Sequence, residues 1–190
     1  MLLIRKTGGG DQVVPDDEAR LDRYDELIQR HANKHGLEWE ILKRQMLAES
    51  EANRWAVSSH GARGLMQFMP ATWREWGEGD PHDPEASIKA GAAYVSFLLS
   101  KFEEIPDLKE RYKFALAAYN AGRPNINRCL EYARKATGAP GFFQDWVDAG
   151  KLPGPWQKWR VASQFLSMVT GRNAAITMQY VNQVMGEEEQ

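Results

Sequence analysis

The sequence has a single cysteine and no long apolar run. Cys129 is the only cysteine among 190 residues, which excludes an internal disulfide and a cysteine-cluster metal site. It has no histidine nearby in the sequence, so we interpret it as a structural thiol rather than a nucleophile. No apolar stretch approaches the ~20 residues of a membrane-spanning helix. We therefore do not expect this chain to insert into a membrane.

An excess of charge of either sign is also missing. The chain has 24 Lys and Arg residues against 26 Asp and Glu residues, a formal net charge of -2. Attraction of the whole surface to nucleic acid needs clustered positive charge, so we expect no nucleic-acid partner. His31 and His35 are four residues apart but lack the glutamate of a zinc-binding helix. We interpret both as residues of a helix surface, and we expect no metal and no cofactor.

The N-terminus lacks the features of a signal peptide. Residues 1–6 are apolar and then basic, which is the reverse of the usual order. We expect that a leader has been removed or that the chain is exported by phage or secretion machinery. Three glycines at 8–10 favour a flexible tail over 1–18, followed by one domain over 19–187.

Alternation with a period of two is absent, whereas apolar residues recur every 3.6 residues from Leu21 onward. This pattern predicts an all-α fold of about seven helices around one core. The expected helices cover 21–35, 38–49, 84–102, 107–121, 125–137, 156–170 and 174–185, with a short one after Pro70. The segment 114–119 is apolar almost all round, which is typical of a central helix.

Glu49 is the first candidate for chemistry. It shares a helical face with Leu42 and Met46. A carboxyl group on an apolar face loses solvation of its charged form, which raises its pKa and suits it to general acid catalysis. The alternatives are a solvated surface glutamate or a buried structural one with a partner.

The loop after Glu49 is rich in serine and glycine. Gly61 and Gly64 allow a tight backbone that a ligand can approach closely. Ser58 and Gln67 offer the donors and acceptors that sugar hydroxyls and N-acetyl groups need. Taken alone, the loop could equally be an ordinary turn with polar groups in solvent.

These residues fall into ordered motifs. Glu49-Ser50 is followed by Ser58, by Gly61-Ala62-Arg63-Gly64-Leu65-Met66-Gln67, and by Met69-Pro70. Downstream come Asp83-Pro84, Ala90-Gly91-Ala92-x-Tyr94 and Ala117-Ala118-Tyr119-Asn120-Ala121-Gly122. The set resembles the soluble lytic transglycosylase (SLT) domain, which is similar to goose-type lysozyme. The resemblance covers about 25–125, and 114–122 most resembles the catalytic domain of the membrane-bound lytic transglycosylase F subfamily.

The resemblance implies a lysozyme-like helical domain that acts on peptidoglycan in the bacterial cell envelope (the periplasm). Members cleave the β-1,4 bond between N-acetylmuramic acid (MurNAc) and N-acetylglucosamine (GlcNAc) and leave 1,6-anhydro-MurNAc ends. By this match, Glu49 is the single general acid and then base. The substrate groove would be lined by Ser58, Gln67, Met69, Tyr119 and Asn120. We expect a monomer whose partner is the glycan strand.

Two other functions remain open. A second carboxylate at Glu75, Glu78, Asp80 or Asp83 would favour a hydrolytic, goose-type-like muramidase. A non-catalytic glycan-binding module, or a phage or secretion-machine component, would keep the fold for docking; an intact Glu49 argues against this.

Some of the same residues also have plainer interpretations. Tyr119 could be a core aromatic and Asn120 a helix cap. Most of the seven tryptophans should pack inside, and the late group of Trp146, Trp156 and Trp159 is favoured for stacking on sugars. One departure from the family stands in the last helix, where many members carry Glu-Thr-Arg. Ile176 replaces that Glu and Met178 replaces that Arg, so we expect the distal groove and the substrate preference, but not the acid, to differ from those members.

Overall fold

The computed structural model describes residues 21–138 and 154–187. The predicted tail over 1–18 and Trp146 lie outside these residues. The chain divides into two compact units, with the boundary after Ser96. This boundary falls inside helix α5 (Pro84–Ser100). Each unit is described by itself, and the prediction of one domain over 19–187 stays a prediction.

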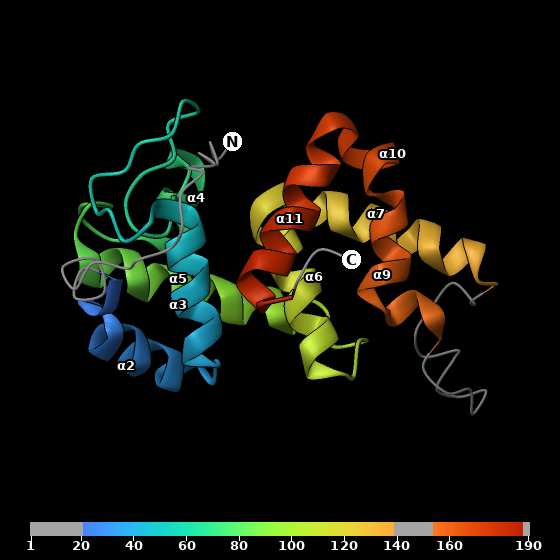
Figure 1. Ribbon diagram of the computed structural model, residues 1–190, viewed down its shortest axis with the longest axis horizontal. Helices are drawn as coiled ribbons and strands as arrows, with labels where there is room; N and C mark the ends of the chain where they lie inside the picture. The colour runs from blue at the N-terminus through green and yellow to red at the C-terminus, as the bar shows by residue number, and fades with distance from the viewer. Residues whose placement is uncertain (1–20, 139–153, 188–190) are drawn as a thin grey trace, which may run out of the picture. The chain divides into compact units, whose positions relative to one another are not determined.

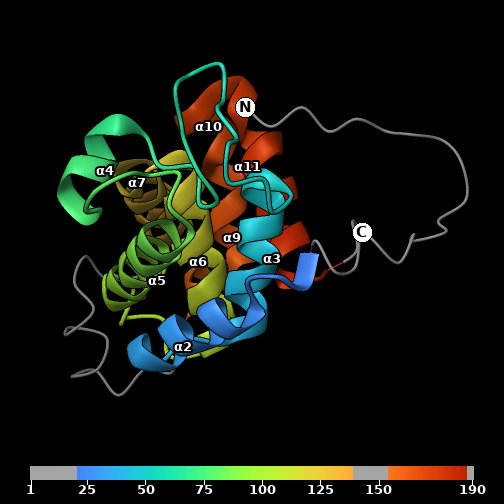
Figure 2. The same cartoon turned by 90° about the vertical axis from the view of Figure 1, so that its left-hand side faces the viewer.

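The first unit contains α2 (Asp25–His35), α3 (Trp39–Ser50), α4 (Pro70–Trp76) and most of α5. Helix α2 packs on α3, and a long loop leaves the C-terminal end of α3 (Figures 1 and 2). Gly36 ends α2 in the left-handed conformation, as its position predicts. The core of this unit includes the apolar residues Ile28, Ala32, Leu42, Met46, Leu65, Met66, Ile88 and Ala92.

His31 corrects one expectation from the sequence. Its side chain is buried, not on the helix surface, and its Nε2 lies 2.7 Å from Oε1 of Glu85 at the start of α5. Glu85 also pairs with Arg30. The periodicity placed His31 on the apolar face of α2, but the sequence does not show that a carboxylate from another helix meets it there.

Helix α6 (Leu108–Ala121) is the centre of the second unit. It packs against α7 (Arg123–Ala136), α9 (Trp159–Ala162) and α11 (Ala174–Met185) (Figure 1). All residues of 114–118 are buried, which confirms the central position predicted for this apolar segment. Its start is capped by Asp107, whose Oδ1 accepts a hydrogen bond of 3.1 Å from the N–H of Glu110.

The helix predicted over 156–170 is interrupted. A 3-10 turn (Pro155–Gln157) ends at Lys158, which has extended backbone, and helical structure restarts at Trp159. It continues through a 3-10 turn (Ser163–Phe165) into α10 (Leu166–Thr170). The Trp159 N–H donates to the Glu110 carboxylate over 2.6 Å. This contact from another helix satisfies a donor that a continuous helix would satisfy internally, so the break could not be read from local periodicity.

The all-α, lysozyme-like fold predicted from the sequence is confirmed. Within 21–138 and 154–187 there are no strands, only two isolated bridges that join Arg63 to Val57 and to Phe68. No helix in these ranges combines the length and the apolar character that crossing a bilayer requires.

Cys129 lies on α7 and is fully buried. Burial raises the pKa of its thiol from 9.0 to about 11, which lowers the thiolate fraction at pH 8 by roughly 100-fold. We expect a thiol-specific disulfide reagent to leave the native protein unmodified and to label it stoichiometrically in urea. Rapid labelling of the native protein would contradict the structural interpretation of this thiol.

Candidate functional site

Glu49 occupies the last turn of α3, where the apolar face of the helix reaches the protein surface. Leu42 and Met46, on the same face, are buried, whereas Glu49 is only partly exposed. Two consecutive residues in the left-handed region, Glu51 and Ala52, end the helix at φ 51° and 60°. The chain therefore turns sharply two residues after the carboxyl group and leads directly into the loop that follows.

The loop over 56–68 is held by its own backbone. The Ser58 N–H donates to the Ala62 carbonyl over 2.9 Å, and the Gly64 N–H donates to the Ala56 carbonyl over 3.0 Å. Arg63 and Phe68 exchange two backbone hydrogen bonds of 3.0 and 3.1 Å. An irregular segment with this many internal hydrogen bonds has a defined conformation.

Gly64 occupies a position that admits no side chain. It has a φ of 76°, and a Cβ there would lie 1.9 Å from the Pro81 carbonyl oxygen. Two residues later, the Met66 N–H donates to Oγ of Ser87 over 3.2 Å. The absence of a Cβ therefore lets the loop pack directly on the turn and helix that follow it.

The structure gives Ser58 and Gln67 roles within the loop. Oγ of Ser58 accepts from the Ala62 N–H over 3.0 Å. Nε2 of Gln67 donates to the carbonyls of Gly64 and Ala56 over 3.0 and 3.2 Å, and its Oε1 takes part in neither bond. Met69, which precedes α4, is 42% exposed. A role for these three residues in lining a groove stays a prediction.

Tyr119 and Asn120 belong to the second unit, in the last turn of α6. Oδ1 of Asn120 accepts a hydrogen bond of 2.8 Å from Oγ1 of Thr177 on α11. Asn120 thus links two helices, which differs from the helix-capping role considered from the sequence. Tyr119 is partly exposed rather than buried with the residues before it. That these two residues and Glu49 line one groove stays a prediction.

The four candidates for a second carboxylate are all in the first unit, and three have structural partners. Glu78 pairs with Lys89 at 3.0 Å. Asp80 accepts from the His82 N–H over 2.9 Å, and Asp83 accepts from the Ala86 N–H over 2.8 Å at the start of α5. Glu75 is exposed on α4. Turn formation and helix capping therefore account for both aspartates.

The tryptophan whose exposure best suits stacking on a sugar is not one of the late group of Trp146, Trp156 and Trp159. Trp156 and Trp159 are buried, which contradicts the expectation that they stack on sugars; Trp146 lies outside the described residues. Trp55, in the loop after Glu49, is 63% exposed. The Arg54 guanidinium lies 4.7 Å from its ring centroid and the His82 ring 5.4 Å away. Trp55 lies in a polar segment without helical periodicity, and this feature of the sequence could have indicated that its ring is exposed.

Ile176 is exposed on α11, while the adjacent Thr177 is buried against α6. The replaced family position therefore faces solvent in the described part of the second unit, and its apolar side chain adds no charge there.

The sequence matches the family model described as "Transglycosylase SLT domain" over residues 26–140. Membrane-bound lytic murein transglycosylase F of Desulfosudis oleivorans is 35% identical over 125 residues, covering 66% of this chain and 28% of that protein. The Maricaulis maris protein of the same name is 44% identical over 108 residues, covering 55% of this chain and 23% of its own. The chain thus spans about a quarter of the length of these relatives.

A solved structure supports the fold. It is an inactive mutant of lytic transglycosylase Slt from Pseudomonas aeruginosa, and it matches with a TM-score of 0.50 and 24% identity over 85% of this chain and 25% of that one. Because the family match covers more than half of the sequence, the chain belongs to the transglycosylase SLT domain family.

Proposed function

We propose that this protein is a peptidoglycan lytic transglycosylase. It cleaves the β-1,4 bond between MurNAc and GlcNAc, leaves 1,6-anhydro-MurNAc ends, and acts in the bacterial cell envelope. The observation that carries the proposal is the position of Glu49, at the partly exposed end of a buried helical face and directly before a loop fixed by its own hydrogen bonds.

The reaction uses one carboxyl group twice. Protonated Glu49 donates its proton to the glycosidic oxygen, the C1–O bond of MurNAc breaks, and GlcNAc leaves with a free 4-hydroxyl. The Glu49 carboxylate then takes the proton from the C6 hydroxyl of the same MurNAc, whose oxygen bonds to C1. The acid is regenerated and no water is consumed. An internal nucleophile has a high effective concentration, so no second carboxylate is needed to hold a water.

Analysis of the products by mass spectrometry tests the proposal directly. Digestion of purified peptidoglycan should give fragments with anhydro ends, which are lighter than hydrolysed ends by one water. Ordinary reducing MurNAc ends would replace the proposal with a hydrolytic muramidase. The absence of any product, under conditions in which the folded protein binds glycan, would instead favour a binding module.

A second prediction separates the one-carboxylate mechanism from hydrolysis. Glu75→Gln, Glu78→Gln, Asp80→Asn and Asp83→Asn should each lower the rate by less than about tenfold, or about 1.4 kcal/mol of barrier, with anhydro ends unchanged. Asparagine still forms turns and caps helices, so the two Asp→Asn variants should keep their local structure. Glu78 forms an exposed ion pair with Lys89, and such a pair contributes little to stability.

Ile176→Glu provides the complementary control, because it restores the carboxyl group found in many family members. It should change affinity in the distal groove without converting the products to hydrolysed ends. Loss of turnover in one of the four amides, with the fold intact, would identify the second carboxylate of a muramidase.

A further inference from the structure

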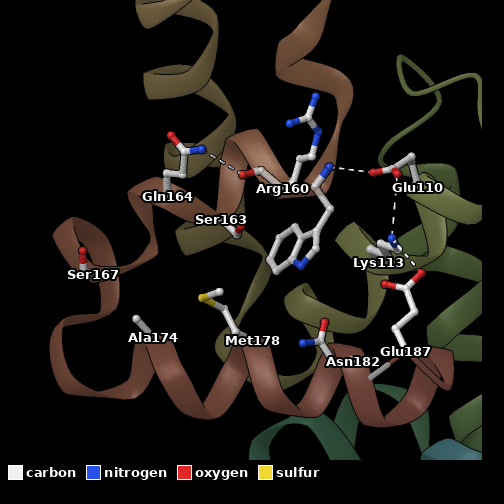
Figure 3. A pocket seen from close by; sticks show the side chains of 11 residues that line it. Glu110, Lys113, Arg160, Ser163, Gln164, Ser167, Ala174, Met178, Asn182 and Glu187 are labelled. Carbon is white, nitrogen blue, oxygen red and sulfur yellow. Dashed lines mark hydrogen bonds and ion pairs between the residues drawn. The ribbon is translucent and has the colours of Figure 1, made fainter. Parts of the chain in front are cut away.

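The second unit contains a pocket of about 900 Å³. It lies between α6, the helical run that begins at Trp159, and α11 (Figure 3). Pockets that bind small molecules typically have volumes of about 300–1,000 Å³. Neither Glu49 nor any of the five residues predicted to line the substrate groove lines this pocket, and the proposed reaction assigns it no role. Trp159, which the sequence favoured for stacking on sugars, and Met178, which replaces the family Arg, do line it.

At one end of the pocket, the charged side chains pair with one another. Nζ of Lys113 lies 2.9 Å from a Glu187 oxygen and 3.8 Å from a Glu110 oxygen. Burial alone would raise the pKa of Glu187, but hydrogen bonds from Lys113 and Lys109 lower it overall. Glu110 also accepts from the backbone of Trp159. Nζ of Lys109 lies 3.1 Å from the same Glu187 oxygen, so the two lysines balance the two carboxylates and this end does not determine the charge of a ligand.

Arg160 is the charge that remains. Its side chain is exposed, lines the pocket, and makes no ion pair with the residues of 21–138 and 154–187. A guanidinium in this position favours a carboxylate, which it can bind through two parallel hydrogen bonds. The ligand that complements the pocket therefore carries negative charge at this side.

The other polar lining groups are neutral. Ser163, Gln164 and Ser167 come from the run after Arg160, and Asn182 comes from α11 (Figure 3). Nε2 of Gln164 donates to the Arg160 carbonyl over 3.2 Å. Hydroxyl and amide groups of this kind pair with the N–H and C=O groups of a peptide backbone. Their distribution on two walls suits an extended ligand with repeated amides.

The aromatic lining argues against a sugar. A sugar stacks on an exposed ring face, but Trp159 is only 5% exposed and packs edge-on against Phe114 with 5.4 Å between ring centroids. The large exposed apolar side chain in the lining is Met178, which is 41% exposed and projects from α11; Ala174, on the same helix, adds a methyl group. A flexible thioether accommodates aliphatic side chains of varied shape. A peptide fits these walls better than a sugar ring.

We propose that this pocket binds a short peptide bearing free carboxylates, with Arg160 as its anchor. The identification of that peptide as the stem peptide of peptidoglycan rests on the proposed function. The pocket would then hold peptide-bearing strands through residues separate from those predicted to contact the glycan.

Isothermal titration calorimetry of the full chain with a synthetic stem peptide tests the proposal without turnover. The peptide should bind, whereas the same peptide with its carboxyl groups amidated should bind at least about tenfold more weakly, as expected for one charge-assisted pair. Arg160→Gln should remove this difference. Arg172→Gln, a matched change at an exposed arginine of the same unit outside the pocket, should behave like the wild type. A GlcNAc tetramer should not compete.

A kinetic comparison adds a second readout. Arg160→Gln should raise KM for peptide-bearing strands and leave peptide-free strands unaffected, with kcat unchanged for both. No binding of the acid peptide to wild type, or equal binding by Arg160→Gln, would overturn the inference even if the products carry anhydro ends. If the products are hydrolysed instead, the proposed function fails while the calorimetric result for the pocket stands.

Discussion

Glu49→Gln should fold normally, and its turnover should fall by about 10²- to 10⁴-fold or more. Glutamine keeps the shape and hydrogen-bonding capacity of the side chain but cannot deliver a proton, and general acid–base catalysis is typically worth this factor. In the proposed reaction the same group acts in both proton transfers, so its loss affects both. Release of anhydro fragments from purified peptidoglycan measures the rate, and circular dichroism verifies the fold.

Glu51→Gln is the matched control for this change. Glu51 lies two residues further on, is exposed, and has already left α3 in the left-handed conformation. The same chemical substitution there should keep activity near the wild-type level. Substantial turnover by Glu49→Gln, or equal losses in both variants, would remove Glu49 from the catalytic role.

Gly64→Ala should lower the free energy of unfolding by about 2–5 kcal/mol. A left-handed backbone with a Cβ costs roughly 1–2 kcal/mol, and overpacking typically adds about 1–3 kcal/mol. The added methyl group would lie 1.9 Å from the Pro81 carbonyl oxygen and 3.2 Å from Oγ of Ser87, so the loop or the turn must move. This is a large part of the about 5–15 kcal/mol that stabilises a typical domain. Urea denaturation measures the change.

Gly61→Ala separates the two contributions. Gly61 is also left-handed, at φ 85°, but a Cβ there would have no heavy atom within 4 Å. This variant should therefore lose only the backbone contribution, about 1–2 kcal/mol. Equal destabilisation of the two variants would show that contact with Pro81 does not make Gly64 necessary.

Local periodicity predicted most of the fold because burial on one helical face is a property of the sequence itself. The central α6 follows from its continuous apolar segment, and the end of α2 follows from Gly36. The break before Trp159 and the partner of His31 could not be predicted in this way. Both depend on carboxylates, Glu110 and Glu85, that approach from distant parts of the chain.

The candidate site shows the same division. The motifs gave Glu49 and the loop after it, since these lie within one short stretch of sequence. They did not indicate that Ser58 and Gln67 bind their own loop, because that depends on a particular backbone conformation with Gln67 at φ 46°. The tryptophans were misjudged because Trp156 and Trp159 flank a long loop-rich segment, yet both side chains pack inward.

The hydrogen bonds within the loop over 56–68 have a consequence for the thermodynamics of ligand binding. Fixing the backbone of one residue costs roughly 1–2 kcal/mol of conformational entropy. Here most of the partners that fix the backbone, among them the Ala56, Ala62 and Phe68 carbonyls, belong to the loop itself, and one more, Oγ of Ser87, lies on α5. The entropy is therefore lost when the protein folds and not when a glycan arrives. A ligand that binds this loop does not have to order its backbone. The free energy of the ligand's contacts therefore contributes to affinity without being reduced by the conformational entropy of the loop.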